Sequence, residues 1–580
     1  MGKIDWSTIT RKDVIKAIRI FVKDNLEYPE PKSTFLLFEG KKLPAKHIRG
    51  MAYKVVHGIE VSKNDYAGGM ETVRFFRKLG FDMFYNGEIL CGNSQQLSPD
   101  VNLPEKSSND ILQNTLFKNP LKIGQQNTIS IKMENEKEER KGLKIGLYLQ
   151  TQTDHNPEAF QRIMNIVSDT VFDILVFPED CYCPEIEELW QLDIAQKEDV
   201  EQIREYCLSL SRQINKAVVF SPFDKYCTPY SVFANYKADE TETEFAVYIK
   251  HTMAESSVFE FDNYKEIARE MFRPIIYKGY KIGMTICYDC NHAPFSRMWG
   301  INGVDIILNS TGGDVVYDKW YKYNKVRAIE NQCYNFVTMG GAGTNNNAHT
   351  YVYGFNPEGG ELPFHNLMSD TDRTNEINTV YVYDTSLDNR EAQVENSLYQ
   401  KETANKHQDY FFPVEHMHTV LEQAEKIDAN IRILSYQGNT LVFCMIEGLS
   451  IMHPEYPLRL LYSDKLKEYQ NKRYILINYH KKEIEQNFFE TKLSIVLKVR
   501  AMENFCAVIL ESPNIKHCYQ TGNNRTAQVI PAENGYYGID ISRTSGPEAI
   551  WKNKQGMKSD WRNNFEWLIS QIQDKKCSNV

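Results

Sequence analysis

The sequence predicts an α/β sandwich, because short apolar runs of strand length alternate with segments of helical periodicity through the middle of the chain. Apolar residues make up 42% and charged residues 25% of the 580 residues, which is typical of a soluble globular protein with several domains. The end of the chain repeats part of the middle, since Lys498-Val-Arg-Ala-Met-Glu-Asn-Phe-Cys506 follows Lys325-Val-Arg-Ala-Ile-Glu-Asn-Gln-Cys333. These observations predict two related α/β regions.

The first 85 residues predict a small basic domain of mixed secondary structure. Helical periodicity covers residues 11–25, 44–56 and 66–80, and a hairpin-like unit begins at Phe35. The segment holds 16 Lys and Arg against 10 Asp and Glu, so its net charge is +6, whereas the net charge of the whole chain is −10. Its stretches 43–53 and 68–81 resemble the N-terminal head domain of McrA-type restriction endonucleases and related host-defence proteins. The domain is compatible with DNA or RNA binding, and a protein-contact module is the alternative.

Residues 86–141 predict a linker, because they consist mainly of Asn, Gln, Ser, Lys and Glu, which cannot form a buried core. Within them, we expect Leu112 to Ile123 to form a short segment that docks on a folded part of the chain. No run of about 18 apolar residues predicts a membrane span, and the first residues lack the apolar core of a signal peptide. Twelve scattered cysteines favour free thiols in a reducing compartment. We therefore expect a cytoplasmic protein.

The region 142–395 contains three predicted strands that end on reactive side chains: Glu179, Lys250 and Cys287. Cys287 lies between the strand that begins at Lys281 and a predicted helix over 291–301. Free backbone N–H groups and the positive end of a helix dipole favour a thiolate there, which predicts an activated nucleophile. A single buried cysteine is more often structural, but three such strand ends in this order are hard to explain by chance.

The order Glu, Lys, Cys and five surrounding motifs resemble the nitrilase superfamily of carbon–nitrogen hydrolases over about residues 144–385. The motifs are Lys144-Ile-Gly-Leu-Tyr-Leu-Gln150, Phe177-Pro-Glu179, Lys250-His251, Ile286-Cys-Tyr-Asp289 and Arg327-Ala-Ile-Glu-Asn-Gln-Cys333. The resemblance implies a four-layer αββα sandwich that cleaves an amide or nitrile through a thioester on a cysteine. It also implies the use of no cofactor and the pairing of subunits across a two-fold axis.

By the same resemblance, Glu179 takes the proton of Cys287 and later activates water. Lys250 and the backbone N–H of Tyr288 stabilise the developing anion. Glu255 and Glu260 both compete for the role of an auxiliary glutamate. The segment after Asp289, Cys290-Asn-His-Ala-Pro-Phe-Ser-Arg297, departs from the common pattern of the family, which leaves the substrate open.

Three alternatives to hydrolysis stay open. Cys287 and Cys290 form a CxxC pair that, with Cys181 and Cys183, would suit zinc or redox chemistry, although no second CxxC is present. The sandwich would otherwise be a silent binding or sensor protein, or an acyltransferase that uses the same three residues. The basic first domain makes an antiviral defence setting the expected context of a hydrolase.

Residues 400–580 predict a degenerate partial repeat of the central region. Thr440 to Glu447 parallels the nucleophile strand and places Met445 or Ile446 at the position of Cys287, so the thiol is lost. Too few residues precede this strand to supply the Glu and Lys strands. The apolar face of the repeat therefore needs cover, and we expect the central region of the same chain to provide it, with the repeat replacing part of a second subunit. The alternative is an independently folded tail that binds another protein, and a homo-oligomer also stays open.

Overall fold

A computed structural model of the chain describes most of residues 6–90, 142–387 and 424–577. Gaps remain inside these ranges, among them 24–33, 62–69, 253–267, 342–349, 522–526 and 550–561. The chain divides into two compact units, Met1–Glu105 and Lys106–Val580. The predicted linker, apart from its first strand, and the predicted piece from Leu112 to Ile123 lie outside the described residues.

In its described residues, the first unit is a four-stranded antiparallel sheet with three helices. Its strands are β1 (Thr34–Phe38), β2 (Lys41–Pro44), β3 (Asp82–Tyr85) and β4 (Glu88–Leu90), in the order β2-β1-β3-β4. The three predicted helices are present as α1 (Arg11–Lys23), α2 (Ala45–His57) and α3 (Met70–Lys78). Buried Ile18, Leu36, Ile48 and Phe76 come from four of these elements. They form a small core, and the buried Arg49 of α2 pairs with Glu71 of α3 at 3.0 Å.

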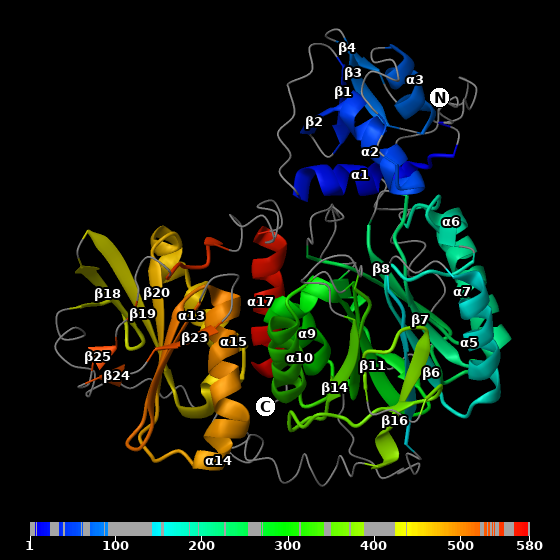
Figure 1. The fold of residues 1–580 in the computed structure, drawn as a ribbon. Coiled ribbons are helices and arrows are strands. Elements are labelled where there is room, and N and C mark those ends of the chain that lie inside the picture. The colour runs from blue at the N-terminus through cyan, green and yellow to red at the C-terminus, as the bar shows by residue number, and fades with distance from the viewer. Residues whose placement is uncertain are drawn as a thin grey trace. The chain divides into compact units, whose positions relative to one another are not determined.

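The second unit begins with a seven-stranded sheet. Its strands are β5 (Lys144–Leu149), β6 (Ile174–Glu179), β7 (Ala217–Ser221), β8 (Tyr230–Ala234), β9 (Phe245–Ile249), β15 (His365–Asn366) and β16 (Thr379–Asp384). Their order is β15-β16-β5-β6-β7-β8-β9. Helices α5 (Pro157–Asp169), α6 (Ile186–Leu189) and α7 (Lys197–Ile214) lie along its outer face (Figure 1). The Asn156 side chain begins α5 by accepting the N–H of Ala159 at 2.9 Å.

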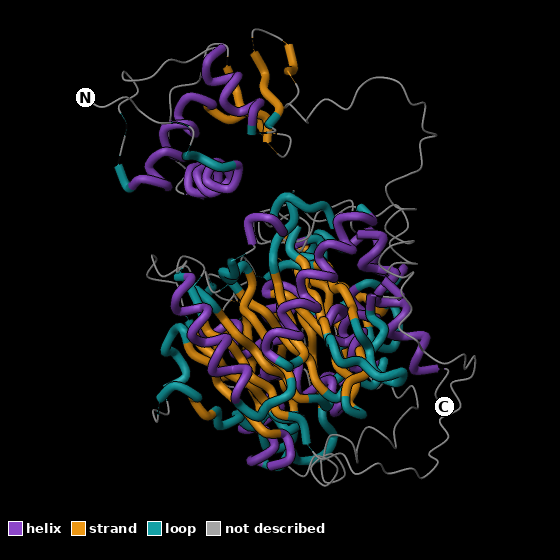
Figure 2. The backbone as a smooth tube through the Cα atoms, turned by 90° about the vertical axis from the view of Figure 1, so that its right-hand side faces the viewer, coloured by secondary structure: helices purple, strands orange, loops and turns teal. Residues whose placement is uncertain are grey.

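A five-stranded sheet packs against the inner face of the first sheet. It contains β10 (Ile275–Tyr277), β11 (Tyr280–Ile286), β12 (Ile306–Thr311), β13 (Tyr334–Met339) and β14 (Tyr351–Phe355), in that order. Tyr334 and Phe336 of β13 contact Tyr383 of β16, with ring centroids 6.5 and 6.0 Å apart. Helices α9 (Ala293–Ile301) and α10 (Tyr317–Asn331) cover the outer face, and the side view shows the strands enclosed by helices (Figure 2).

The predicted four-layer αββα sandwich is therefore confirmed. Gly283 of β11 permits the close approach of α9, because a Cβ there would lie 2.6 Å from the Trp299 ring. The Trp299 indole N–H donates to the Met284 carbonyl at 2.7 Å and fixes the helix on the sheet. No helix in the described part of the chain combines the length and the apolar character needed to cross a membrane.

The tail, which we define as residues 424–577, forms a third sheet beside α9 and α10. Its strands are β17 (Glu425–Lys426), β18 (Ile431–Tyr436), β19 (Asn439–Glu447), β20 (Arg473–Tyr479), β21 (Ala507–Glu511), β22 (Lys516–Thr521) and β23 (Ala527–Ile530), in that order. Strands β18 to β22 pair in the same directions as β10 to β14, antiparallel at both edges and parallel in the middle. Helices α13 (Glu455–Leu461), α15 (Ser494–Asn504) and α17 (Arg562–Cys577) lie on the side that faces the central region (Figure 1).

The strand pairing corrects one detail of the predicted repeat. Strands β11 and β19 each continue directly into a five-residue 3-10 turn. We call Cys287–Asn291 the nucleophile turn, after the role predicted for Cys287, and Gly448–Met452 the tail turn. The pairing registers of the neighbouring strands agree with this correspondence. Gly448 therefore occupies the position of Cys287, and the assignment of Met445 or Ile446 was wrong. Both of those side chains lie within the strand, where an apolar run gives no marker of register.

Candidate active site

The structure brings Glu179 and Lys250 together at the carboxyl ends of β6 and β9. The Lys250 ammonium lies 2.8 Å from one Glu179 oxygen, and each residue is only 4% exposed. A register shift between Val176 and Glu179 and a left-handed Asp180, with φ of 56°, turn the chain sharply at the end of β6. Both charges are therefore held in place by the ends of the strands and shielded from water.

The second Glu179 oxygen accepts the backbone N–H of Gly312, just after β12, at 3.0 Å. The N–H of Gly312 also acts on the Cys287 thiol, whose pKa it lowers. Charges on Lys250 and Glu179 act on the same thiol with opposite signs. The three predicted strand-terminal residues thus converge on one place.

Cys287 opens the nucleophile turn with φ of 43°, in the left-handed region that residues with a side chain rarely adopt. The side chain is 3% exposed. Burial raises the pKa of Cys287 and outweighs the opposing effect of Lys250. The prediction that the turn by itself favours a thiolate was wrong, because loss of water costs the sulfur anion more than the nearby dipoles return.

Burial lowers the pKa of Lys250, but Glu179 and Cys287 outweigh burial and the net shift is upward. The lysine is therefore a fixed cation at neutral pH. A cation beside a neutral thiol and a carboxylate can accept developing negative charge on a third group.

Sequence reasoning missed the role of Asp289, which ties the nucleophile turn to the segment after Lys250. The Asp289 carboxylate accepts the backbone N–H groups of His251 and Thr252 at 3.2 and 3.0 Å. It also accepts the hydroxyls of Thr252 and Tyr248, both at 2.8 Å. Burial raises the pKa of Asp289 to about 6, although Lys250 and these hydrogen bonds lower it. Its position two residues after the nucleophile was the only signal in the sequence.

His251 is fully enclosed by aromatic rings, with the centroid of Phe295 at 4.7 Å and that of Phe272 at 5.3 Å. Burial lowers the pKa of His251 to about 3, so the imidazole is neutral at pH 7. Its Nδ1 lies 3.1 Å from the Tyr248 hydroxyl. These contacts fit a packing role for His251 beside the lysine.

The predicted substrate-binding residue Tyr288 is buried in the nucleophile turn, and its ring centroid lies 4.9 Å from that of Trp320 on α10. Cys290 is also buried, and its sulfur lies 3.6 Å from an Asn291 oxygen. Within the described ranges, no three His, Cys, Asp or Glu side chains gather as a metal site. Glu255 and Glu260 lie outside the described residues.

Comparisons with known proteins agree with the two resemblances seen in the sequence. Residues 150–358 match the family model of carbon–nitrogen hydrolases, and residues 7–84 match that of the ScoMcrA-like N-terminal head domain. No curated protein matches the chain.

Solved structures similar to the chain include two from this group of enzymes. An amidase from Nesterenkonia sp. is 17% identical over 44% of this chain and 95% of its own, with a TM-score of 0.31. A carbon–nitrogen hydrolase from Helicobacter pylori G27 is 14% identical over 47% of this chain and 97% of its own, with a TM-score of 0.34. By its two family matches, the chain resembles carbon–nitrogen hydrolases over residues 150–358 and the ScoMcrA-like head domain over residues 7–84.

Proposed function

We propose that the central region hydrolyses the carbon–nitrogen bond of a small amide or nitrile through a thioester on Cys287. The observation that carries this proposal is the buried pair of Glu179 and Lys250, 2.8 Å apart, whose charges both act on the Cys287 thiol. Two charges at the ends of different strands stay buried at a cost in solvation. Such a cost is expected where function requires the pair.

For an amide substrate, Glu179 accepts the thiol proton as the Cys287 sulfur bonds to the carbonyl carbon. The carbonyl oxygen becomes an anion, which Lys250 and the backbone N–H of Tyr288 stabilise. The carbon–nitrogen bond then breaks, and the departing nitrogen takes the proton from Glu179. Ammonia or an amine leaves, and the acyl group remains on sulfur as a thioester.

Water completes the reaction. Glu179 takes one proton from water as the oxygen attacks the thioester carbon. The carbon–sulfur bond breaks, the acid leaves, and the Cys287 sulfur takes the proton from Glu179. Because burial raises the pKa of the resting thiol, a base must take its proton in the first half of the cycle. In the second half the base acts on water, and Glu179 fills both roles.

Intact mass spectrometry after incubation with a panel of primary amides and nitriles tests this proposal. An acyl adduct that maps to Cys287, and that disappears on dilution as the acid forms, supports it. The matched control is Cys290→Ala, which removes the neighbouring thiol and should still form the adduct. Transfer to an added amine instead of water would favour the acyltransferase. No adduct on Cys287 with any compound would favour a silent binding protein.

We further propose that the protein works in the cytoplasm, in a host-defence setting, with the first unit contacting nucleic acid. The nine cysteines in the described residues are all free, which suits a reducing compartment. Arg74 and Lys78 are exposed one helical turn apart on α3, and Arg77 lies beside them. Such a basic face suits phosphate contacts.

Binding of a labelled DNA duplex at increasing salt tests the role of the first unit. Reversing the charges of Arg74, Arg77 and Lys78 together should abolish a steeply salt-dependent interaction. Lys16→Glu, at an exposed position on α1, controls for a change in net charge. Salt-independent binding, or none to DNA or RNA, would make the unit a protein-contact module.

A further inference from the structure

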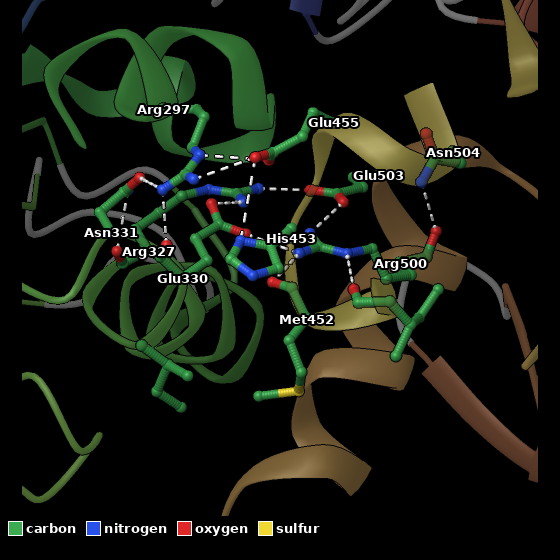
Figure 3. A network of polar contacts seen from close by, with 12 residues as sticks. Arg297, Arg327, Glu330, Asn331, Met452, His453, Glu455, Arg500, Glu503 and Asn504 are labelled. Carbon is green, nitrogen blue, oxygen red and sulfur yellow. Dashed lines mark hydrogen bonds and ion pairs between the residues drawn. The ribbon is translucent and has the colours of Figure 1, made fainter. Parts of the chain in front are cut away.

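The tail joins the central region through two arginines and two glutamates at the crossing of α10 and α15. Arg327 and Glu330 come from α10, and Arg500 and Glu503 come from α15; together they form the Arg–Glu quartet (Figure 3). Each arginine pairs with the glutamate three residues later on its own helix and with the glutamate of the other helix. Arg500 lies 2.6 Å from Glu503 and 2.8 Å from Glu330.

The quartet is sealed from water, since all four residues are at most 6% exposed. Burial opposes the charged form of Glu503, but Arg500 and Arg327 outweigh it and hold the pKa of Glu503 below its usual range. The Nε–H groups of both arginines, which do not bond to the glutamates, donate to backbone carbonyls. Arg327 thus donates to two carboxylates and one carbonyl, and Arg500 donates to two carboxylates and two carbonyls.

Those carbonyls belong to the two equivalent turns. The Arg327 Nε donates to the Cys290 carbonyl at 2.9 Å, inside the nucleophile turn. The Arg500 Nε donates to the Ile451 carbonyl at 3.1 Å, at the same place in the tail turn. Arg327 therefore connects Glu503 of the tail to the turn that carries Cys287.

Two further contacts come from the tail to the same corner. Glu455 of α13 accepts two hydrogen bonds from Arg297 of α9, at 3.0 and 3.2 Å. Arg297 in turn donates to the Glu330 carbonyl at 2.7 Å. The Phe565 ring of α17 contacts His292 and Phe295, directly after the nucleophile turn, with centroids 6.4 and 6.1 Å apart. The outer side of the nucleophile turn is thus supported by residues of the tail.

We propose that the tail is a built-in partner of the central region and that Glu503 is a positioning residue for Cys287, acting through Arg327 and the Cys290 carbonyl. The proposal deepens the proposed function and rests on it, since it names what holds the nucleophile of that site. A glutamate without this role would matter only for stability. One with this role sets the orientation of the sulfur.

The test compares Glu503→Gln with Lys492→Ala in the full-length protein. Glutamine keeps the shape of the side chain and removes the charge that holds Arg327. Lys492 pairs with Glu358, also across the two regions, and this ion pair does not involve the nucleophile turn. The readout is the rate of alkylation by iodoacetamide, a small primary amide, mapped separately at Cys287 and at buried Cys207 of α7.

We expect Glu503→Gln to slow alkylation of Cys287 about tenfold and to leave Cys207 unchanged. Lys492→Ala should leave both rates within about twofold. Glu503→Asp, which keeps the charge on a shorter side chain, should give a smaller loss and replaces the glutamine variant if that one does not fold. Both kcat and kcat/KM for any amide substrate should fall with the alkylation rate.

Two results would overturn the proposal. In the first, Cys287 reacts within about twofold of the wild-type rate in both Glu503 variants. In the second, Cys287 and Cys207 become more reactive together, because Glu503 then serves only to keep the whole protein closed. Alkylation needs no turnover, so an absence of amide hydrolysis would count against the proposed function and not against the role of Glu503.

Discussion

The nucleophile turn and the tail turn have the same backbone and different chemistry. Each is a five-residue 3-10 turn that follows a parallel strand and opens in the left-handed region, at φ of 43° for Cys287 and 55° for Gly448. A histidine follows each turn, at positions 292 and 453. The side chain at the first position is a thiol in one turn and is absent in the other.

This difference separates what the fold needs from what the reaction needs. Glycine adopts a left-handed φ without steric cost, whereas a residue with a Cβ adopts it at about 1 kcal/mol or more. The tail has the unstrained residue, and the central region keeps the strained one. The strained backbone at Cys287 therefore serves to hold the sulfur at the site. Contacts from the Arg–Glu quartet and from Asp289 stabilise the turn in this conformation.

The largest expected effect comes from making the two turns alike at Cys287. Both Cys287→Ala and Cys287→Gly should lower turnover about 10⁴-fold or more, because no neighbour can form the acyl intermediate. The glycine variant should be more stable than the alanine variant by about 1 kcal/mol, since only alanine keeps the left-handed strain. Steady-state kinetics and thermal unfolding measure the two effects.

Cys290→Ala, the control for that experiment, should keep substantial activity. Equal losses at Cys287 and Cys290, together with stoichiometric zinc in the protein, would replace the hydrolase with a metal site. Equal stabilities of the alanine and glycine variants would mean that the turn relaxes when the sulfur is removed.

Removing the tail should have the next largest effect. Ending the chain after residue 395 uncovers α9 and α10 and leaves Arg327 and Glu330 without their partners on α15. A buried charge that loses its partner costs about 3–5 kcal/mol, so we expect the shortened protein to aggregate or self-associate in light scattering. Removing residues 1–85, which belong to a separate compact unit, should not do so. A soluble, monomeric and fully active 1–395 protein would contradict a built-in partner.

A smaller effect should appear in the pH profile, through the one acidic residue that the tail turn lacks. Asp289 has a pKa of about 6, so its protonation below that pH weakens its hold on the segment after Lys250. We expect kcat/KM to fall about tenfold per unit below pH 6. Because the pKa is raised relative to the unfolded chain, protonation of this group favours the folded state, and the loss should occur without unfolding.

Substitution of Asp289 by Asn should remove this fall of kcat/KM below pH 6, which we call the acid limb of the pH profile. His251→Asn should leave the position of the limb unchanged, because burial holds the pKa of His251 near 3. A limb that moved with His251 and persisted without Asp289 would assign the titration to the imidazole.

The smallest expected effect comes from giving the tail a thiol. Gly448→Cys should form no acyl adduct at position 448, because no Glu or Lys strand faces β19 among the described strands of the tail. It should destabilise the protein by about 1 kcal/mol, since φ of 55° suits glycine. Peptide mapping after incubation with substrate and thermal unfolding measure the outcome. An adduct at that position would show that the fold supplies the chemistry without the missing strands.

Residues at the ends of strands were predictable from sequence, because an apolar run that stops on a charged or reactive residue marks its own end. Glu179 and Lys250 were found in this way, and the structure places their side chains together. The role of Asp289 was not, since its partners lie 37 to 41 residues earlier in the chain. Nothing local distinguishes such a carboxylate from one that faces solvent.

The register of the tail shows a second limit. Thr440 to Glu447 is apolar throughout its middle, so sliding it by two or three residues changes no pattern. The histidines at 292 and 453 would have fixed the alignment and identified Gly448. The protonation state of the Cys287 thiol was mispredicted for another reason. It depends on how completely the thiol is buried, and burial is set by all layers of the fold together.

The Arg–Glu quartet joins two regions that are linked by the 36 residues from 388 to 423. Where two separate chains meet at such charges, dilution separates them and leaves each set unpaired. A covalent link gives the second region an effective concentration on the order of millimolar at any protein concentration. Every central region is therefore made together with the tail that supports it. The tail can lack reactive groups of its own, and each chain still has one supported site.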